Sequence, residues 1–235
     1  MTNLSQPADP DSGTRSYRFY WPIVCLYVAM QLVSDVTAGK LISFAGFSVS
    51  VTVLYFPFTY IFADVLTEVY GYAKARRALW MVLICSVLAG LIYQVAVYMP
   101  APEGFDASDA YRRVLGIVPR VLVGGWIAVF AGEISNNYVM AKMKLVFKGR
   151  HLWARTIGST IVGQFTNTVL FYVIALYGVI PNNLLVESVL MGWILKVAVE
   201  AVMTPVTYWV VGRLKVAEKE DYFDRDTNFN PFILT

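Results

Sequence analysis

The sequence predicts an all-α integral membrane protein with about six transmembrane helices. Of its 235 residues, 57% are hydrophobic and 15% are charged, whereas a soluble globular domain has about 25% charged residues. Several apolar runs reach the roughly 20 residues that a helix needs to cross a bilayer. The two cysteines, Cys25 and Cys85, both lie inside such runs, which excludes a secreted disulfide scaffold.

Six apolar segments of spanning length follow one another along the chain. The second is the most polar, because its C-terminal half contains Asp64 and Glu68. Pro57 and Pro205 stand inside the second and sixth segments and are expected to bend them. The stretch 100–119 is rich in Pro and Gly, which favours an irregular outer loop over another span. The predicted spans are Tyr20–Ala38, Val51–Tyr72, Ala78–Met99, Val118–Met140, Ala154–Val179 and Val186–Val211.

The basic residues predict that both termini face the cytoplasm. With the N-terminus inside, 14 Lys and Arg residues fall on the cytoplasmic side and 4 fall in outer loops, with Lys196 left inside a span. Residues 1–15 read as a disordered cytoplasmic tail without a cleavable signal. Residues 16–215 form the six-helix domain, and residues 216–235 form a second cytoplasmic tail, which is expected to be solvated.

Polar side chains recur at one depth in four of the predicted spans. A charge near the membrane centre costs about 2.5–3.5 kcal/mol on insertion scales, so such residues usually serve a function. Counted from the cytoplasmic basic residues at a helix rise of about 1.5 Å per residue, these side chains lie roughly 14 to 20 Å into the membrane. This layer near the midplane predicts a binding site. Its members are Asp64, Glu133, Gln164, Asn167 and Glu200.

The remaining charges within the spans leave alternatives open between ion pairing and a role in coupling. Lys196 and Glu200 are four residues apart and would neutralise each other on one helix. A pair between Asp35 and Lys196 across two helices is an equally simple explanation. Glu68 lies close enough to Lys74 to be an interfacial residue. Because five carboxylates face one lysine, some must be protonated, neutralised by a bound cation or open to water.

A cavity with this composition suits a small polar, planar or cationic solute. A carboxylate accepts two parallel hydrogen bonds from an amidine-like edge, such as that of a guanine, and amide side chains both donate and accept. A second hypothesis is an intramembrane enzyme that uses Asp64 and Glu133 as paired carboxylates. A third is a membrane scaffold whose polar groups pair off and leave no cavity.

Several functions are excluded by what the sequence lacks. His151 is the only histidine and is expected at the cytoplasmic interface, so no metal site and no cofactor are predicted. The motifs of P-loop ATPases, zinc proteases and serine hydrolases are absent, so no catalytic residues and no enzyme are predicted. A net charge of +3 is too small for a nucleic-acid surface.

Two stretches of sequence resemble a known transporter family. In the second span, residues 56–60 read Phe-Pro-Phe-Thr-Tyr, residues 67–72 read Thr-Glu-Val-Tyr-Gly-Tyr, and Asp64 lies between them. In the fifth span, residues 163–168 read Gly-Gln-Phe-Thr-Asn-Thr. With these blocks, the chain resembles the queuosine precursor transporter family, also called the vitamin uptake transporter family. This sequence has Asp35 after Ser34, where the family has Asn.

The resemblance implies a fold and a substrate class. The fold would be similar to the substrate-binding components of energy-coupling factor transporters. The function would be import of deazaguanine precursors of queuosine (preQ0, preQ1 or queuine) across the bacterial inner membrane. Another small base or a vitamin is the alternative substrate. Coupling to protons or ions, a separate energising ATPase module, uncoupled transport and a homo-oligomer all stay open.

Roles for the polar residues follow from this resemblance as hypotheses. A carboxylate, Asp64 or Glu133, would bind the amidine-like edge of the base. Amides would read the rest of the ring, and an aromatic side chain would stack on it. The amides are Gln164 and Asn167, and the aromatic candidates are Tyr60 and Phe165.

Overall fold

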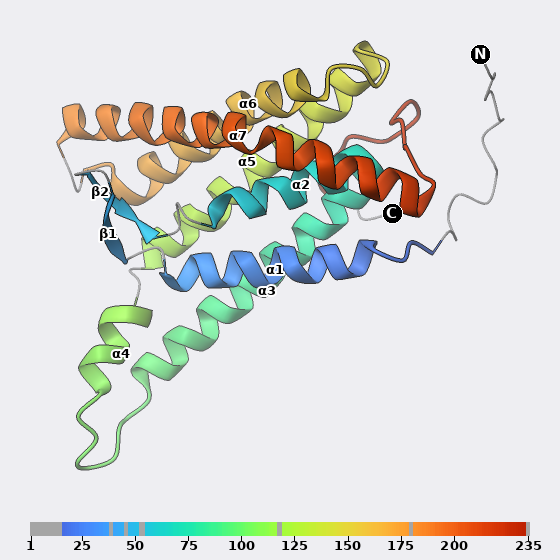
Figure 1. The fold of residues 1–235 in the computed structure, drawn as a ribbon. Helices are drawn as coiled ribbons and strands as arrows, with labels where there is room; N and C mark the ends of the chain where they lie inside the picture. The colour runs from blue at the N-terminus through green and yellow to red at the C-terminus, as the bar shows by residue number, and fades with distance from the viewer. Residues whose placement is uncertain are drawn as a thin grey trace, which may run out of the picture.

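The computed structural model contains seven α-helices and one β-hairpin in the residues that it describes (Figure 1). The described residues are 16–37, 40–44, 47–51, 55–116, 119–178 and 181–233. The elements are α1 (Tyr20–Thr37), β1 (Leu41–Phe44), β2 (Phe47–Ser50), α2 (Phe56–Tyr70), α3 (Tyr72–Tyr98), α4 (Ser108–Leu115), α5 (Pro119–Val146), α6 (Leu152–Leu176) and α7 (Asn182–Glu218).

Four helices in the described residues are long and apolar enough to cross a membrane. They are α3, α5, α6 and α7, which correspond to the third to sixth predicted spans. The prediction of a helical, multi-pass membrane protein is therefore confirmed. Helix α1 has 18 residues and α2 has 15. At about 1.5 Å per residue, α2 is roughly 22 Å long, which is shorter than a hydrocarbon core of about 30 Å.

Helix α2 lies inside the bundle and packs against α1, α3, α5 and α7. From Thr59 to Tyr70 nearly every side chain is buried, including the apolar side chains of Val65, Leu66 and Val69. A helix that is covered by other helices can be short and can carry charges, because it does not face lipid. The helix begins at Phe56, so Pro57 stands in its first turn, where proline is well tolerated. The expectation that Pro57 bends this helix is therefore wrong.

Helices α5 and α6 approach each other closely through two glycines. A Cβ atom at Gly132 would lie 2.6 Å from the Cβ of Asn167, and one at Gly163 would lie 2.6 Å from the Cβ of Asn136. Each glycine is four residues before the asparagine of its own helix, so the contact is reciprocal. Small residues allow membrane helices to pack at short distance. Here they bring both asparagines to the α5–α6 contact.

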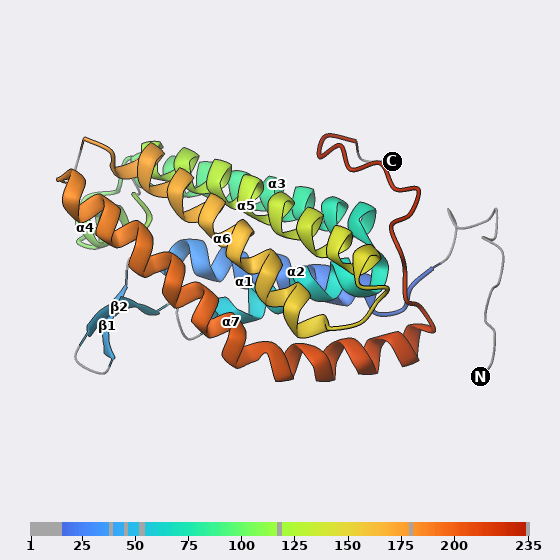
Figure 2. The ribbon, with the colours of Figure 1, turned by 90° about the horizontal axis from the view of Figure 1, so that it is seen from above.

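The two ends of the bundle differ. The β-hairpin and α4 lie at one end, and the first and last described residues lie at the other (Figure 1). Helix α4 falls within the stretch predicted to be irregular, so that prediction is wrong for residues 108–115. None of its side chains is buried. Figure 2 shows that α7 changes direction part-way along its length, and Pro205 lies inside this helix, as expected.

The C-terminal segment, residues 219–233, folds back over the start of α3. The Asp224 carboxylate is 2% exposed and accepts the backbone N–H of Tyr72 at 3.1 Å. Arg76 donates to the carbonyl of Asn228 at 2.7 Å. The expectation of a solvated tail is therefore wrong for this segment. Its partners are the N–H groups that the first turn of a helix leaves unpaired and a buried arginine, neither of which the tail sequence reveals.

Alanine in place of Gly132 should destabilise the protein. Its Cβ would meet the Asn167 side chain and the Gly163 carbonyl, which lies 2.9 Å away, and overpacking of this kind costs about 1–3 kcal/mol. Thermal unfolding of the purified protein in detergent measures the change. Gly212→Ala is the matched control, because nothing lies within 4 Å of a Cβ at Gly212 in α7. Equal melting temperatures for both variants would contradict the predicted contact.

Candidate functional site

The structure brings three carboxylates of the predicted layer together from three helices. Asp64 on α2 and Glu200 on α7 are both 0% exposed, and Glu133 on α5 is also buried. The three groups are close enough for their charges to repel one another. Gln164 on α6 is buried beside them, since the Tyr60 hydroxyl of α2 donates to its Oε1 at 2.8 Å.

Some oxygens of this layer have partners within the bundle. The Asn136 Nδ2 donates to Asp64 Oδ1 at 3.0 Å, and Tyr27 on α1 forms a hydrogen bond with Glu133. Neither Asn136 nor Tyr27 is among the residues that the sequence predicts for the layer. The signal for Asn136 was its distance of four residues from Gly132, which places it at the α5–α6 contact.

Other polar atoms of the layer are buried without a partner. Among the described residues, no hydrogen bond reaches Asp64 Oδ2, Glu133 Oε2, Asn136 Oδ1 or either carboxylate oxygen of Glu200. A buried polar atom without a partner costs about 1–3 kcal/mol, and more if it is charged. Native proteins rarely retain several such atoms in one place without a functional reason. Together they form a polar centre able to accept hydrogen bonds from a bound molecule.

Lys196 on α7 contributes a cation close to this centre, and it forms hydrogen bonds with side chains of α6. Its Nζ donates to Asn167 Oδ1 at 2.9 Å and lies 3.4 Å from Thr168 Oγ1. Among the described residues, neither carboxylate oxygen of Glu200 receives a hydrogen bond. Asp35 accepts from Gln31 at 2.8 Å on its own helix. Lys196 also lies within electrostatic reach of Glu133.

Phe165 does not join the buried layer. Its side chain is 47% exposed on the surface of the bundle, and its ring packs edge-on against Trp193 of α7 at 5.4 Å. Tyr60, in contrast, is buried and bonded to Gln164. Of the two aromatic candidates, the structure therefore brings only Tyr60 to the layer.

Below the layer, Glu68 forms the centre of a buried ion cluster. It is 0% exposed, and both of its carboxylate oxygens bind the Arg155 guanidinium of α6. Lys215 of α7 lies 2.6 Å from it, and Lys144 of α5 lies 3.6 Å away. Asp221 binds the same two lysines at 2.8 and 2.6 Å. Glu68 is therefore not an interfacial residue beside Lys74, and the cluster joins α2, α5, α6, α7 and the C-terminal segment.

Two carboxylates of the C-terminal segment lie in opposite electrostatic settings. Burial tends to raise the pKa of Asp221, but hydrogen bonds from Lys144 and Lys215 outweigh it and hold this pKa below its usual range. Burial raises the pKa of Asp224, and its bonds to Thr227 and the Tyr72 N–H only partly oppose the effect. Asp221 is therefore an ionic link between the C-terminal segment and the bundle, and its contribution to stability is lost only when the pH falls below the usual carboxyl range toward this lowered pKa.

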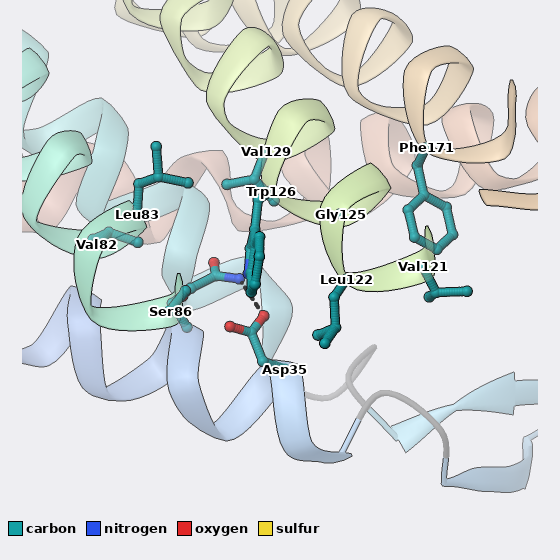
Figure 3. A pocket seen from close by; sticks show the side chains of 11 residues that line it. Asp35, Val82, Leu83, Ser86, Val121, Leu122, Gly125, Trp126, Val129 and Phe171 are labelled. Atoms are coloured by element: carbon teal, nitrogen blue, oxygen red, sulfur yellow. Dashed lines mark hydrogen bonds between the residues drawn. The ribbon is translucent and has the colours of Figure 1, made fainter. Parts of the chain in front are cut away.

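A cavity of about 150 Å³ lies beside Asp35, between α1, α3 and α5 (Figure 3). Asp35 was predicted to form an ion pair or to take part in coupling. Among the described residues it bonds to Gln31, and its carboxylate faces this cavity. The structure therefore separates Asp35 from the layer around Asp64.

The sequence matches a known protein family over most of the helical bundle. Residues 50–210 match the family model described as putative vitamin uptake transporter. The chain belongs to this family. The matched region contains the three carboxylates of the layer but not Asp35. This result confirms the resemblance found in the sequence.

Two curated relatives carry more specific names. A probable queuosine precursor transporter of Bacillus subtilis is 30% identical over 147 residues, which cover 62% of this chain and 64% of the relative. The queuosine precursor transporter of Escherichia coli is 23% identical over 166 residues, which cover 71% of this chain and 72% of the relative. The chain thus matches slightly less than two thirds of the Bacillus protein. Both relatives are named as transporters, not as enzymes. No solved structure matches.

Substituting Glu68 by Gln should strongly destabilise the protein, because the buried Arg155 would lose the carboxylate that pairs with it and Lys144 would keep only Asp221. Breaking one side of a buried ion pair costs about 3–5 kcal/mol. Thermal unfolding in detergent and the yield of monodisperse protein measure this loss. Glu103→Gln, at an exposed carboxylate in the loop between α3 and α4, is the control. An unchanged melting temperature for Glu68→Gln would show that the cluster does not hold the helices together.

Proposed function

We propose that this protein imports queuosine precursors, the deazaguanines preQ0 and preQ1 and also queuine, across the bacterial inner membrane. The observation that carries the proposal is the buried group of unpartnered carboxylate oxygens in a chain of this family. The names of the Bacillus and Escherichia relatives support the substrate class. The route would pass through the layer formed by Asp64, Glu133 and their neighbours.

The chemistry of a deazaguanine fits this layer. Its ring N–H and amino group are parallel donors, and a carboxylate accepts such a pair with both oxygens. Asp64 and Glu133 each have one oxygen without a partner. Gln164 and Asn167 would read the remaining ring atoms by exchanging their present bonds to Tyr60 and Lys196 for bonds to the base.

The charges of the layer also favour a positively charged substrate. Asp64, Glu133 and Glu200 face one lysine within the described residues of the layer. The aminomethyl group of preQ1 is a cation, so its arrival would lower the excess of negative charge. Tyr60 is better placed than Phe165 to contact the ring, because Phe165 lies on the bundle surface.

Both termini would face the cytoplasm. The Tyr17 hydroxyl donates to Glu220 at 2.8 Å, and the backbone N–H of Phe19 donates to Glu218 at 2.6 Å. The two ends of the described chain thus lie together, on the side that also holds the Glu68 cluster and its basic residues. The positive-inside rule assigns such an end to the cytoplasm.

Growth of cells that cannot make queuosine precursors provides the test. Cells expressing this protein and fed preQ0, preQ1 or queuine at limiting concentration should regain queuosine in their tRNA. Asp64→Asn and Glu133→Gln should lower this signal at least about tenfold, because hydrogen bonds to a charged group contribute about 1.5–3 kcal/mol. Membrane fractions report the amount of each variant.

Glu187→Gln is the control for this experiment, because Glu187 is an exposed carboxylate on α7. It should restore queuosine as well as the wild type does. If the wild-type protein reaches the membrane and none of the three precursors restores queuosine, the proposed substrate is wrong. If the precursors work equally well with Asp64→Asn and Glu133→Gln, the transport role stands and the proposed site is wrong.

A further inference from the structure

The cavity beside Asp35 lies in the half of the bundle that holds the hairpin and α4. Asp35 is two residues from the end of α1, next to the hairpin (Figure 1). A second hollow of about 20 Å³ shares Asp35, Ser86 and Trp126 with the first and extends to Val114 and Leu115 of α4. The two hollows are therefore adjacent, and the smaller one lies between Asp35 and α4.

The lining of this space combines one charge with polar and aromatic groups. Among the described residues that line the two hollows, Asp35 alone is charged. Figure 3 shows Asp35, Ser86 and the indole of Trp126 close together at one side of the cavity. The indole is held in place by Gly90 of α3, where a Cβ would lie 2.7 Å from the ring. The remaining walls are mostly apolar.

Size and chemistry both point to a planar ligand. A cavity of about 150 Å³ is large enough for an aromatic ring, and an indole offers a face or an edge for it. Asp35 accepts a hydrogen bond from Gln31 and interacts with the hydroxyl of Ser86; both partners are neutral, and no cation is among the described residues that line the cavity. A ligand with a positively charged N–H donor would supply the counter-charge that this lining does not offer to the carboxylate.

A row of polar side chains leads from this cavity to the buried layer. Tyr27, Gln31 and Asp35 are spaced by four residues and share one face of α1. Tyr27 bonds to Glu133 in the layer, whereas Gln31 lines the cavity and bonds to Asp35. The cavity and the layer are therefore linked along one helix.

We propose that the cavity around Asp35 is an outward-facing binding site for a planar nitrogen heterocycle that carries a positive charge. Asp35 binds the cationic group, and Trp126 contacts the ring. The inference rests on the proposed function, in which this site receives the substrate before the layer around Asp64 does. It predicts that the cationic preQ1 is preferred over the neutral preQ0 and that Asp35 is the cause.

Isothermal titration of the purified protein with preQ1 and preQ0 tests the proposal. Gly125 lines the cavity, and a Cβ there meets nothing within 4 Å, so the side chain of Gly125→Leu should occupy part of the space. This variant should weaken binding of both ligands about tenfold or more. Asp35→Asn should weaken preQ1 binding about tenfold while changing preQ0 binding less than about threefold.

Two matched variants control for these substitutions. Gly212→Leu adds the same side chain at another open helix position, and Asp109→Asn removes an exposed carboxylate on α4. Both should bind like the wild type. Unchanged binding by Gly125→Leu, or equal losses for the two ligands in Asp35→Asn, would overturn the inference. If the wild type binds neither ligand and restores no queuosine in cells, the proposed function fails and the inference fails with it.

Discussion

The carboxylates of α2 must be kept away from lipid, and the arrangement of the bundle follows from this constraint. A charge at the membrane centre costs about 2.5–3.5 kcal/mol, and α2 carries Asp64 and Glu68 four residues apart. The surrounding helices α1, α3, α5 and α7 cover it, so a helix of 15 residues suffices. Glu68 is neutralised by Arg155, Lys144 and Lys215 from other helices. Asp64 has no such ion-pair partner among the described residues, which is consistent with the substrate-binding role that we propose for it.

The polar groups at the two ends of the bundle have different surroundings. At the end with the basic residues, the Glu68 cluster and the C-terminal segment close the space between the helices with ion pairs and hydrogen bonds. Toward the hairpin, the helices leave a cavity beside Asp35 (Figure 3). The ion pairs thus hold the helices together at the Glu68 end, and the cavity beside Asp35 lies toward the hairpin. In an importer, release to the cytoplasm would then require Glu68 and its partners to separate, at a cost that binding of the substrate must help to offset.

The sequence predicted the long apolar helices well, because their length and hydropathy are local properties. It also indicated the buried layer, since charges within apolar runs are conspicuous. It did not predict the partners of Glu68, because Arg155 and Lys215 lie 87 and 147 residues away along the chain. The fold of the C-terminal segment was missed for a similar reason: Asp224 is buried only because it meets the start of α3. The cavity beside Asp35 depends on the contact between Gly90 and Trp126, which no local pattern reveals.

The central claim is that the buried carboxylates and amides recognise the amidine-like edge of a guanine-type base. Competition binding tests this claim most directly, with labelled preQ1 bound to the purified protein and unlabelled preQ0, guanine or adenine added in excess. The account predicts that preQ0 and guanine displace the label, because both carry the ring N–H and amino group that a carboxylate binds. Adenine lacks this pair of donors and should compete at least about tenfold less well. Equal competition by adenine and guanine would contradict the claim.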